Sequence, residues 1–206
     1  MKHVSRKLLA LVAVLCAVVL VGCESPPPFV AYPEGITAPR TVAVMPFENQ
    51  TDSDKGAVFL RKVMQKNLKK KGYVGTSLSD VDQLLSDQFP GGPTTDSIQP
   101  IGRALGVDAV ITGTLQQFGL RLGLPSEEKL DASFAIHETQ TGKVIWQYHD
   151  SIFRVNIAPW GPESLGRGLA EGIMGAPHQG LVYDFYRRLL KEMPNGAESS
   201  EYEVGN

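Results

Sequence analysis

Cysteine is almost absent from this chain of 206 residues. Its two cysteines are Cys16 and Cys23, and no cysteine follows Cys23 in the sequence. The rest of the chain therefore has no disulfide, no thiol nucleophile and no thiolate ligand for zinc. A domain formed there has to be held together by its hydrophobic core.

A surplus of basic residues is also missing. The sequence has 20 Lys and Arg against 22 Asp and Glu, and three of the cations are Lys2, Arg6 and Lys7. Nucleic-acid binding depends largely on cations that neutralise phosphates. We therefore expect no nucleic-acid partner.

The usual catalytic signatures are missing as well. No serine lies in GxSxG, no glycine-rich stretch fits GxxxxGK[ST] or GxGxxG, and no histidines have HxxxH spacing. Each absence is weak when taken singly. Together they predict a protein without catalytic residues, without a metal and without a cofactor.

The first 22 residues have the composition of a signal peptide. A short positive segment ends at Lys7, and residues 8–20 are wholly apolar. A membrane-spanning helix needs about 20 apolar residues, so this run is too short for one. Because Pro26, Pro27 and Pro28 follow closely, we favour a cleaved signal over an uncleaved anchor helix.

The end of that segment resembles the lipobox of bacterial lipoproteins. The residues concerned are Leu20, Val21, Gly22 and Cys23. The resemblance implies cleavage before Cys23 and acyl chains on its sulfur. Each buried methylene contributes about 0.8 kcal/mol to membrane binding, so three acyl chains would give a lasting anchor. Glu24 favours the outer membrane, because Asp at that place is associated with retention in the inner membrane.

Residues 23–39 are predicted to be an acylated, proline-rich tether. At about 3.1 Å per residue, the segment after Cys23 reaches roughly 50 Å at most. A single α/β domain is expected over residues 40–194, and a disordered acidic tail over residues 195–206. The domain should therefore stay near its own membrane, facing the periplasm.

Residues 41–115 alternate between strand and helix patterns. The β-branched run 41–47 ends near Pro46, as a buried strand would. A helix then follows, capped by Asp52 or Ser53 and ended by Gly72, with apolar residues at three- and four-residue spacing. Its cations are expected to form a solvated face: Arg61, Lys62, Lys66, Lys69, Lys70 and Lys71.

The same region predicts further elements in order. They are a strand over 73–77, a short helix capped by Ser79 or Asp80, a loop over 89–93, a helix over 98–105 ended by Gly106, and a strand over 107–115.

A β-hairpin is predicted between residues 130 and 149. Apolar residues alternate with polar ones on both strands, and Gly142 suits the left-handed position of a three-residue loop. This loop would pair Ile136 with Trp146 and Phe134 with Tyr148. Val144 would share their apolar face, and helices should cover that face only.

The C-terminal third contains one strong helical stripe and one ambiguous segment. The stripe runs from Gln179 to Met193. The ambiguous segment is rich in glycine and is either a loop on the core or a partner-contacting arm. Its candidate contact residues are Trp160, Leu165, Leu169, Ile173 and Met174.

Three phrases of the sequence resemble a group of envelope lipoproteins. They are VAVMPFEN at 42–49, ALGVDAVITG at 104–113 and TQTGKVIW at 139–146. The group includes the curli secretion lipoprotein, LpoB-type activators of penicillin-binding proteins and the TolB N-terminal domain. The resemblance implies an α/β domain with a mixed sheet, in two layers with helices mainly on one face or in three layers, that acts through protein contacts.

Three functions follow as expectations. The first is a non-enzymatic accessory lipoprotein that binds another envelope protein in transport or assembly. The second is an envelope enzyme whose pocket uses His137, Glu138, His149 or Asp150. The third is a self-assembling structural lipoprotein, a homo-oligomer.

Overall fold

The computed structural model describes residues 37–53, 55–121, 126–156 and 179–198. They form an α/β fold built on one mixed sheet, as the sequence predicts. The strands are β1 (Thr41–Val44), β2 (Glu48–Asn49), β3 (Val74–Gly75), β4 (Ala109–Arg121), β5 (Ser126–Glu138) and β6 (Val144–Asn156). The helices are α2 (Gly56–Asn67), α3 (Leu78–Gln88), α4 (Ile98–Leu105) and α6 (Gln179–Glu192), with 3₁₀ turns η1 (Leu68–Lys71) and η2 (Thr95–Ser97).

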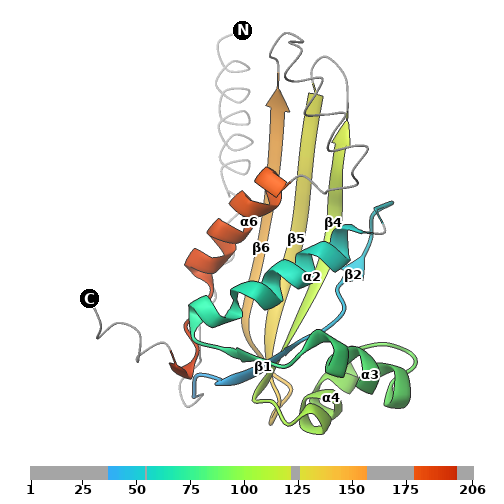
Figure 1. The fold of residues 1–206 in the computed structure, drawn as a ribbon, viewed down its shortest axis with the longest axis vertical. Helices are drawn as coiled ribbons and strands as arrows, with labels where there is room; N and C mark the ends of the chain where they lie inside the picture. The colour runs from blue at the N-terminus through green and yellow to red at the C-terminus, as the bar shows by residue number, and fades with distance from the viewer. Residues whose placement is uncertain (1–36, 54, 122–125, 157–178, 199–206) are drawn as a thin grey trace, which may run out of the picture.

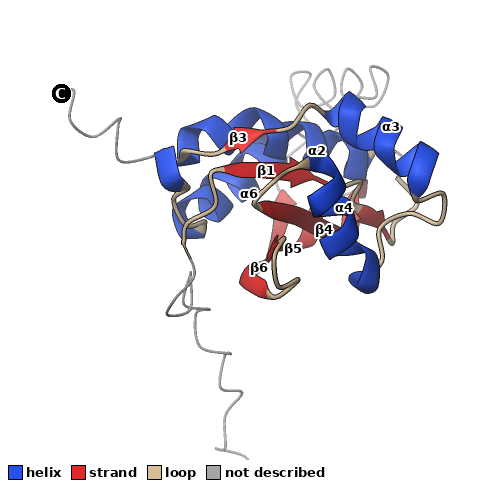
Figure 2. Ribbon diagram, turned by 90° about the horizontal axis from the view of Figure 1, so that it is seen from below, coloured by secondary structure: helices blue, strands red, loops and turns tan. Residues whose placement is uncertain are grey.

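The strands lie in the order β3-β1-β4-β5-β6, and β2 extends the line of β1 along β4. Strand β1 pairs in parallel with β3 and β4, whereas β4, β5 and β6 are antiparallel. Figure 2 shows this order from below. The three long strands project beyond the short parallel part of the sheet (Figure 1).

Helices cover the two faces of the sheet unequally. On one face, α2 and α6 pack over all the long strands and bury the larger core, which includes Ile111, Phe134 and Phe185. On the other face, α3 and α4 cover only the parallel part, where Met45 and Val110 form a second core. Among the described residues both predicted layer arrangements therefore occur, with three layers at the parallel part and two along the hairpin.

Glycines end the turns where the sequence places them. Gly72 ends η1 with φ of 75°, Gly106 ends α4 with φ of 66°, and Gly142 turns the hairpin with φ of 71°. Those angles lie in the left-handed region that glycine adopts without a steric penalty. All three predicted stops are confirmed.

The hairpin register is also confirmed in its main part. Ile136 lies opposite Trp146, and Phe134 lies opposite Tyr148. The prediction for Val144 is wrong, because a bulge at Ile145 shifts the register beside the turn. The bulge buries both Ile145 and Trp146 and leaves Val144 36% exposed.

Both predicted helix caps are wrong. Helix α2 begins after Lys55, and no side chain caps it; the Gly56 amide donates to the Ser53 carbonyl instead. Helix α3 begins after Ser77, whose hydroxyl accepts from the Asp80 amide at 3.2 Å. The cap therefore lies two or three residues before the predicted Ser79 or Asp80, because Ser77 has the extended backbone that a cap requires.

Arg61 is the cation of α2 that the sequence places incorrectly. Its side chain is buried, and its guanidinium donates two hydrogen bonds to the Val44 carbonyl at 2.9 and 3.1 Å. A third bond reaches Asp82 on α3 at 2.6 Å. Arg61 thus joins α2, β1 and α3.

The described chain continues a few residues beyond the predicted domain end. The amides of Gly196, Ala197 and Glu198 donate to backbone carbonyls near β3 and β1, and Arg40 pairs with Glu198 at 2.8 Å. The predicted domain boundaries themselves stay predictions. Within the described ranges, no helix combines the length and apolar character needed to cross a bilayer.

Candidate functional site

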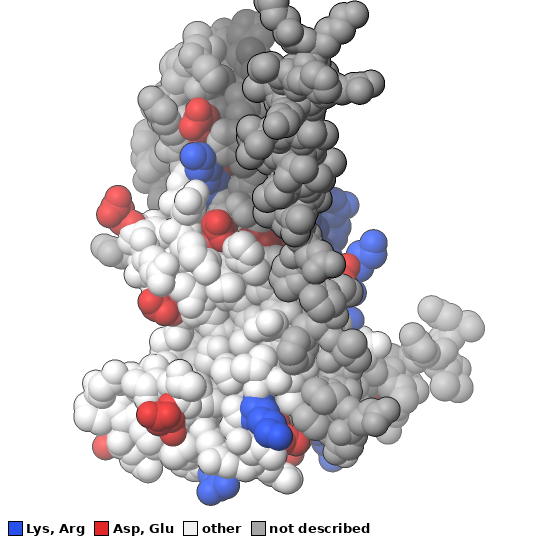
Figure 3. Space-filling view, turned by 180° about the vertical axis from the view of Figure 1, so that it is seen from behind, with Lys and Arg blue, Asp and Glu red and all other residues white. Residues whose placement is uncertain are grey.

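The side of β4–β5–β6 opposite α2 and α6, here called the free face, carries the candidate site. Figure 3 shows this side of the molecule, where charged side chains of both signs are scattered among uncharged ones. Where the free face meets the α3–η2 loop lies a cavity of about 460 Å³, here called the His137 pocket. Its walls are Pro46, Phe47, Glu48, Gly91, Gly92, Pro93, Thr94, Thr95, Ile98, Thr112, Gly113, Thr114 and His137.

The outer wall of the pocket is a loop with a defined shape. The Gly92 amide donates to the Phe89 carbonyl at 2.9 Å, and Gly92 has φ of 77°. Thr94 and Ser97 then form a reciprocal capping box that starts η2. Because Ile98 and Phe89 both pack into the second core, the loop is held at its two ends. The pocket is thus a preformed feature.

His137 lies at the floor of the pocket, near the end of β5. Its Nε2 lies 3.0 Å from the Thr112 hydroxyl on the neighbouring strand β4. Burial lowers the pKa of His137, and a backbone hydrogen bond to Gly142 opposes that effect only in part. His137 is therefore neutral at pH 7 and acts as a hydrogen-bonding group.

Glu48 is the charged residue of the pocket. Strand β2 pairs Glu48 with Thr114 of β4 and brings its carboxylate to the pocket wall. One carboxylate oxygen accepts from the Gln50 amide nitrogen at 2.9 Å, and the other is 3.4 Å from the Thr114 hydroxyl. The carboxylate thus has polar but uncharged neighbours.

The far part of the free face carries exposed apolar side chains on β6. Phe153 is 54% exposed and Val155 is 43% exposed. The Lys129 ammonium lies 5.1 Å from the centre of the Phe153 ring, and closer to the pocket His149 pairs with Asp131 at 2.8 Å. Aromatic residues are enriched at protein-binding surfaces.

Strand β6 also forms one edge of the sheet. It has 13 residues, and among the described residues no strand pairs with its outer side. An edge strand presents unpaired amide and carbonyl groups, which can bind another strand. The free face and this edge are continuous with one another.

The four residues of the predicted enzyme pocket do not come together. His137 lies in the pocket, whereas Glu138 accepts from the Thr141 hydroxyl at the hairpin turn. His149 is paired with Asp131, and Asp150 points to the opposite face, where Tyr148 donates to it and Arg188 lies 3.5 Å away. The geometry therefore provides no shared acid–base site for this alternative.

Several predicted site residues lie outside the described residues. They are Leu20, Val21, Gly22 and Cys23 of the lipobox and Trp160, Leu165, Leu169, Ile173 and Met174 of the glycine-rich segment. These assignments stay predictions. Within the described ranges, no three histidine, aspartate or glutamate side chains are grouped so as to hold a metal ion.

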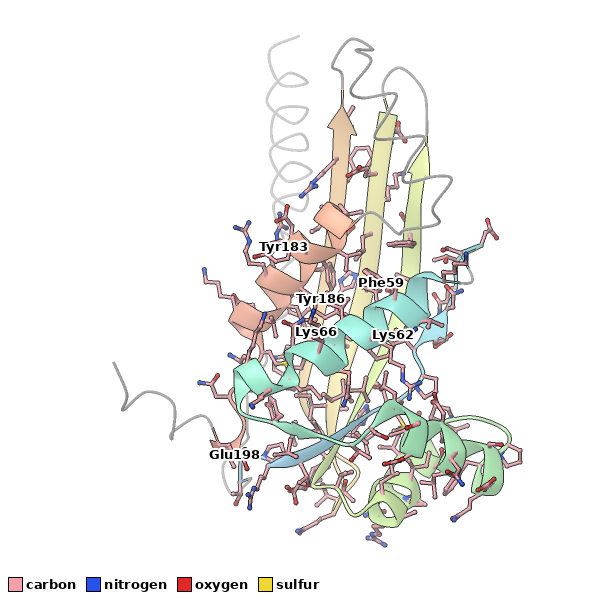
Figure 4. All side chains as sticks on the ribbon, in the orientation of Figure 1. Phe59, Lys62, Lys66, Tyr183, Tyr186 and Glu198 are labelled. Carbon is pink, nitrogen blue, oxygen red and sulfur yellow. The ribbon has the colours of Figure 1, made fainter. Side chains whose placement is uncertain are left out.

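The helix side of the molecule carries exposed cations and an exposed tyrosine. Lys62 and Lys66 project from α2, and Tyr183, 68% exposed, projects from α6 (Figure 4). Tyr186 lies between the two helices and donates to the Leu60 carbonyl. Apart from Arg61 and the half-buried Lys71, the predicted solvated face of cations is confirmed here.

Sequence reasoning did not find Glu48 or Phe153 as site residues. Glu48 lies just beyond the predicted strand 41–47, in the short strand β2, which the sequence pattern does not predict. Phe153 and Val155 lie on the face of β6 that is otherwise polar. Two apolar residues at alternate positions of that face are the sequence signal that could have identified them. Because the predicted hairpin ended near residue 149, that signal was missed.

No protein-family model and no curated protein matches the sequence. Among solved structures, lipoprotein GNA1162 from Neisseria meningitidis superposes with a TM-score of 0.51 at 19% identity, covering 66% of this chain and 97% of that one. The LpoB C-terminal domain from Salmonella enterica gives 0.44 at 16% identity, covering 58% and 86%. The PelC dodecamer from Paraburkholderia phytofirmans gives 0.42 at 14% identity, covering 68% and 86%.

These likenesses concern the fold. The match to GNA1162 shows that this chain has the fold of a known lipoprotein, which confirms the predicted resemblance at that level. At such low identity, the chemistry of a site has to be argued from the residues themselves.

Proposed function

We propose that this chain is a lipoprotein, anchored through acylated Cys23 in the outer membrane and facing the periplasm, that binds another envelope protein. It acts without catalysis, as an accessory component in the transport or assembly of an envelope structure. The anchor rests on the lipobox resemblance. The fold shared with lipoprotein GNA1162 agrees with it.

The observation that carries the binding role is the uneven covering of the sheet. Helices α2 and α6 cover one face of the long strands, whereas α3 and α4 cover only the parallel part of the other. Phe153 and Val155 are therefore left exposed on β6. Adjacent apolar side chains exposed on the same face of a sheet are informative, because contiguous apolar patches mark interaction sites.

Photo-crosslinking in cells tests this proposal. A benzophenone amino acid replaces Phe153 on the free face in one variant and Tyr183 on α6 in the other, since both aromatic side chains are well exposed. We expect a specific adduct with another envelope protein from position 153 alone. Adducts from position 183 alone, or from neither position, would contradict a partner on the free face.

The anchor has its own test. Intact mass of the native protein should show a chain that begins at Cys23 and carries acyl groups, and Cys23→Ala should release the protein from membranes. A native chain that begins at Met1 or lacks acyl groups would refute the anchor while leaving the binding surface untouched.

Self-assembly is the second candidate, and the unpaired outer side of β6 favours it. Two copies could pair their β6 edges across a two-fold axis. Mass photometry of the detergent-solubilised protein separates the candidates. A strict monomer at micromolar concentration removes self-assembly, whereas a discrete oligomer that β6 substitutions dissociate would favour it.

A further inference from the structure

The His137 pocket has a consistent electrostatic character. Among the described residues, its walls contain one carboxylate, that of Glu48, and no lysine or arginine. The other polar groups are hydroxyls and the His137 imidazole, which adds no positive charge at pH 7 because burial lowers its pKa. The pocket therefore attracts a cation and repels an anion.

The Glu48 carboxylate has capacity for another donor. A carboxylate accepts up to about four hydrogen bonds. Glu48 has one good bond, from Gln50, and one long contact, to the Thr114 hydroxyl. Across the described residues no lysine or arginine forms an ion pair with it, and it is exposed at the pocket wall.

A metal ion suits the pocket poorly. Divalent cations in proteins take several oxygen or nitrogen ligands, and the described residues offer no group of three histidine or acidic side chains. The cavity of about 460 Å³ is also much larger than an ion and is within the range of pockets that hold organic groups. An organic cation fits both facts.

The apolar walls suit the stem of a long side chain. Pro46, Pro93 and Ile98 line the cavity together with the aromatic ring of Phe47. Arginine and lysine lay their methylene stems on apolar surface while the charged head meets a polar group. The planar arginine head brings five donors, which matches a carboxylate surrounded by hydroxyls.

We infer that the His137 pocket receives a cationic side chain, preferably arginine, of the protein bound on the free face, and that Glu48 fixes its charged end. This inference rests on the proposed function and adds the chemistry of the partner. The partner should present an arginine within reach of the part of the surface that contacts Phe153.

A titration with small probes tests the pocket without the partner. The probes are N-acetyl-arginine amide and N-acetyl-citrulline amide, which match in shape but differ in charge. The intact chain in neutral detergent carries labelled isoleucine methyl groups, with Ile98 as the pocket reporter and Ile152 on the opposite face as the control. We expect the arginine amide to shift Ile98 with a dissociation constant on the order of 1 mM.

The negative charge of Glu48 should account for the preference for the arginine amide over the citrulline amide. The citrulline amide should bind at least about tenfold more weakly, as expected when a charge-assisted bond is replaced by a neutral one. Glu48→Gln should reduce arginine binding to the citrulline level, whereas Asp87→Asn, at an exposed carboxylate of α3, should leave it unchanged. Equal binding of both probes, or no effect of Glu48→Gln in a variant with normal urea unfolding, would overturn the inference.

The two proposals fail separately. If position 153 forms its adduct but the arginine amide does not bind, the pocket chemistry is wrong and the binding face stands. If the arginine amide binds but no adduct forms, the pocket chemistry stands and the proposed function fails.

Discussion

The two ends of strand β4 lie in different surroundings. At Ala109–Ile111 the strand has β1 beside it and helices over both faces, and its side chains are fully buried. Beyond the bulge at Gln116 the helices that the structure describes cover only one face, and Gln117 is exposed. The first end of β4 stabilises the fold, whereas the second end exposes a surface on which a partner can bind.

The sequence shows this difference directly. Residues 42–45 are a continuous apolar run because both faces of β1 are buried. Strand β5 alternates instead, with Leu130, Ala132, Phe134 and Ile136 buried and the residues between them only partly so. Continuous runs therefore mark the parallel part of the sheet, and alternation marks the hairpin.

The largest effect should come from creating a cavity in the larger core, at the end of β4 that helices cover on both faces. Ile111→Ala removes a fully buried side chain and should lower the free energy of unfolding by about 4 kcal/mol. Val155→Ala on the free face should change it by less than about 0.5 kcal/mol. Urea unfolding measures both, and similar losses would mean that the free face also belongs to the core.

Arg61 gives the next largest contrast. Arg61→Ala leaves the Val44 carbonyl without two donors inside the protein, so we expect a loss of about 3 kcal/mol in the free energy of unfolding. The neighbouring exposed cation provides the control, since Lys62→Ala should be almost neutral. If the two variants unfold alike, Arg61 is solvated, as the sequence pattern indicates.

The start of α3 distinguishes the observed helix cap from the predicted one. Ser77→Ala removes the acceptor of the Asp80 amide and should lower the free energy of unfolding by about 1 kcal/mol. Ser79→Ala removes only a hydroxyl contact with Ser77 and should have a smaller effect. Thermal and urea unfolding of the two variants provide the comparison, and the reverse order would restore the predicted cap.

The smallest effect concerns the pH dependence of stability. Because the folded pKa of His137 is below its unfolded value of about 6.5, the folded state disfavours the proton. The contribution of neutral His137 is therefore present above pH 6.5 and is lost as pH falls towards the folded pKa. His137→Gln should flatten this part of the stability profile, whereas His149→Gln, at an exposed histidine, should leave it in place.

The turns, the hairpin register and most helices could be predicted from short stretches of the sequence. Gly72, Gly106 and Gly142 are predictable because a left-handed residue is a local requirement. Arg61 was missed because its burial depends on α3, which meets α2 only in the folded chain. The bulge at Ile145 was missed because alternation alone assumes an unbroken ladder.

The pocket could not be predicted from sequence. Its walls come from four separated segments around Phe47, Pro93, Gly113 and His137. The pairing of β4 with β2 and β5 brings three of them together, and the packing of Phe89 and Ile98 into the second core brings the fourth. His137 is a predicted site residue, but the structure places its predicted partners Glu138 and Asp150 away from the pocket. The spacing of residues along the sequence does not indicate which loop covers His137.

The most direct test of the free face is hydroxyl-radical footprinting of Phe153 and Tyr183. These two aromatic residues are well exposed on opposite sides of the described molecule. Their oxidation is compared between the purified protein and the protein in native membranes. We predict that membranes protect Phe153 and leave Tyr183 reactive. Unchanged oxidation of Phe153, or protection of Tyr183 alone, would contradict the account.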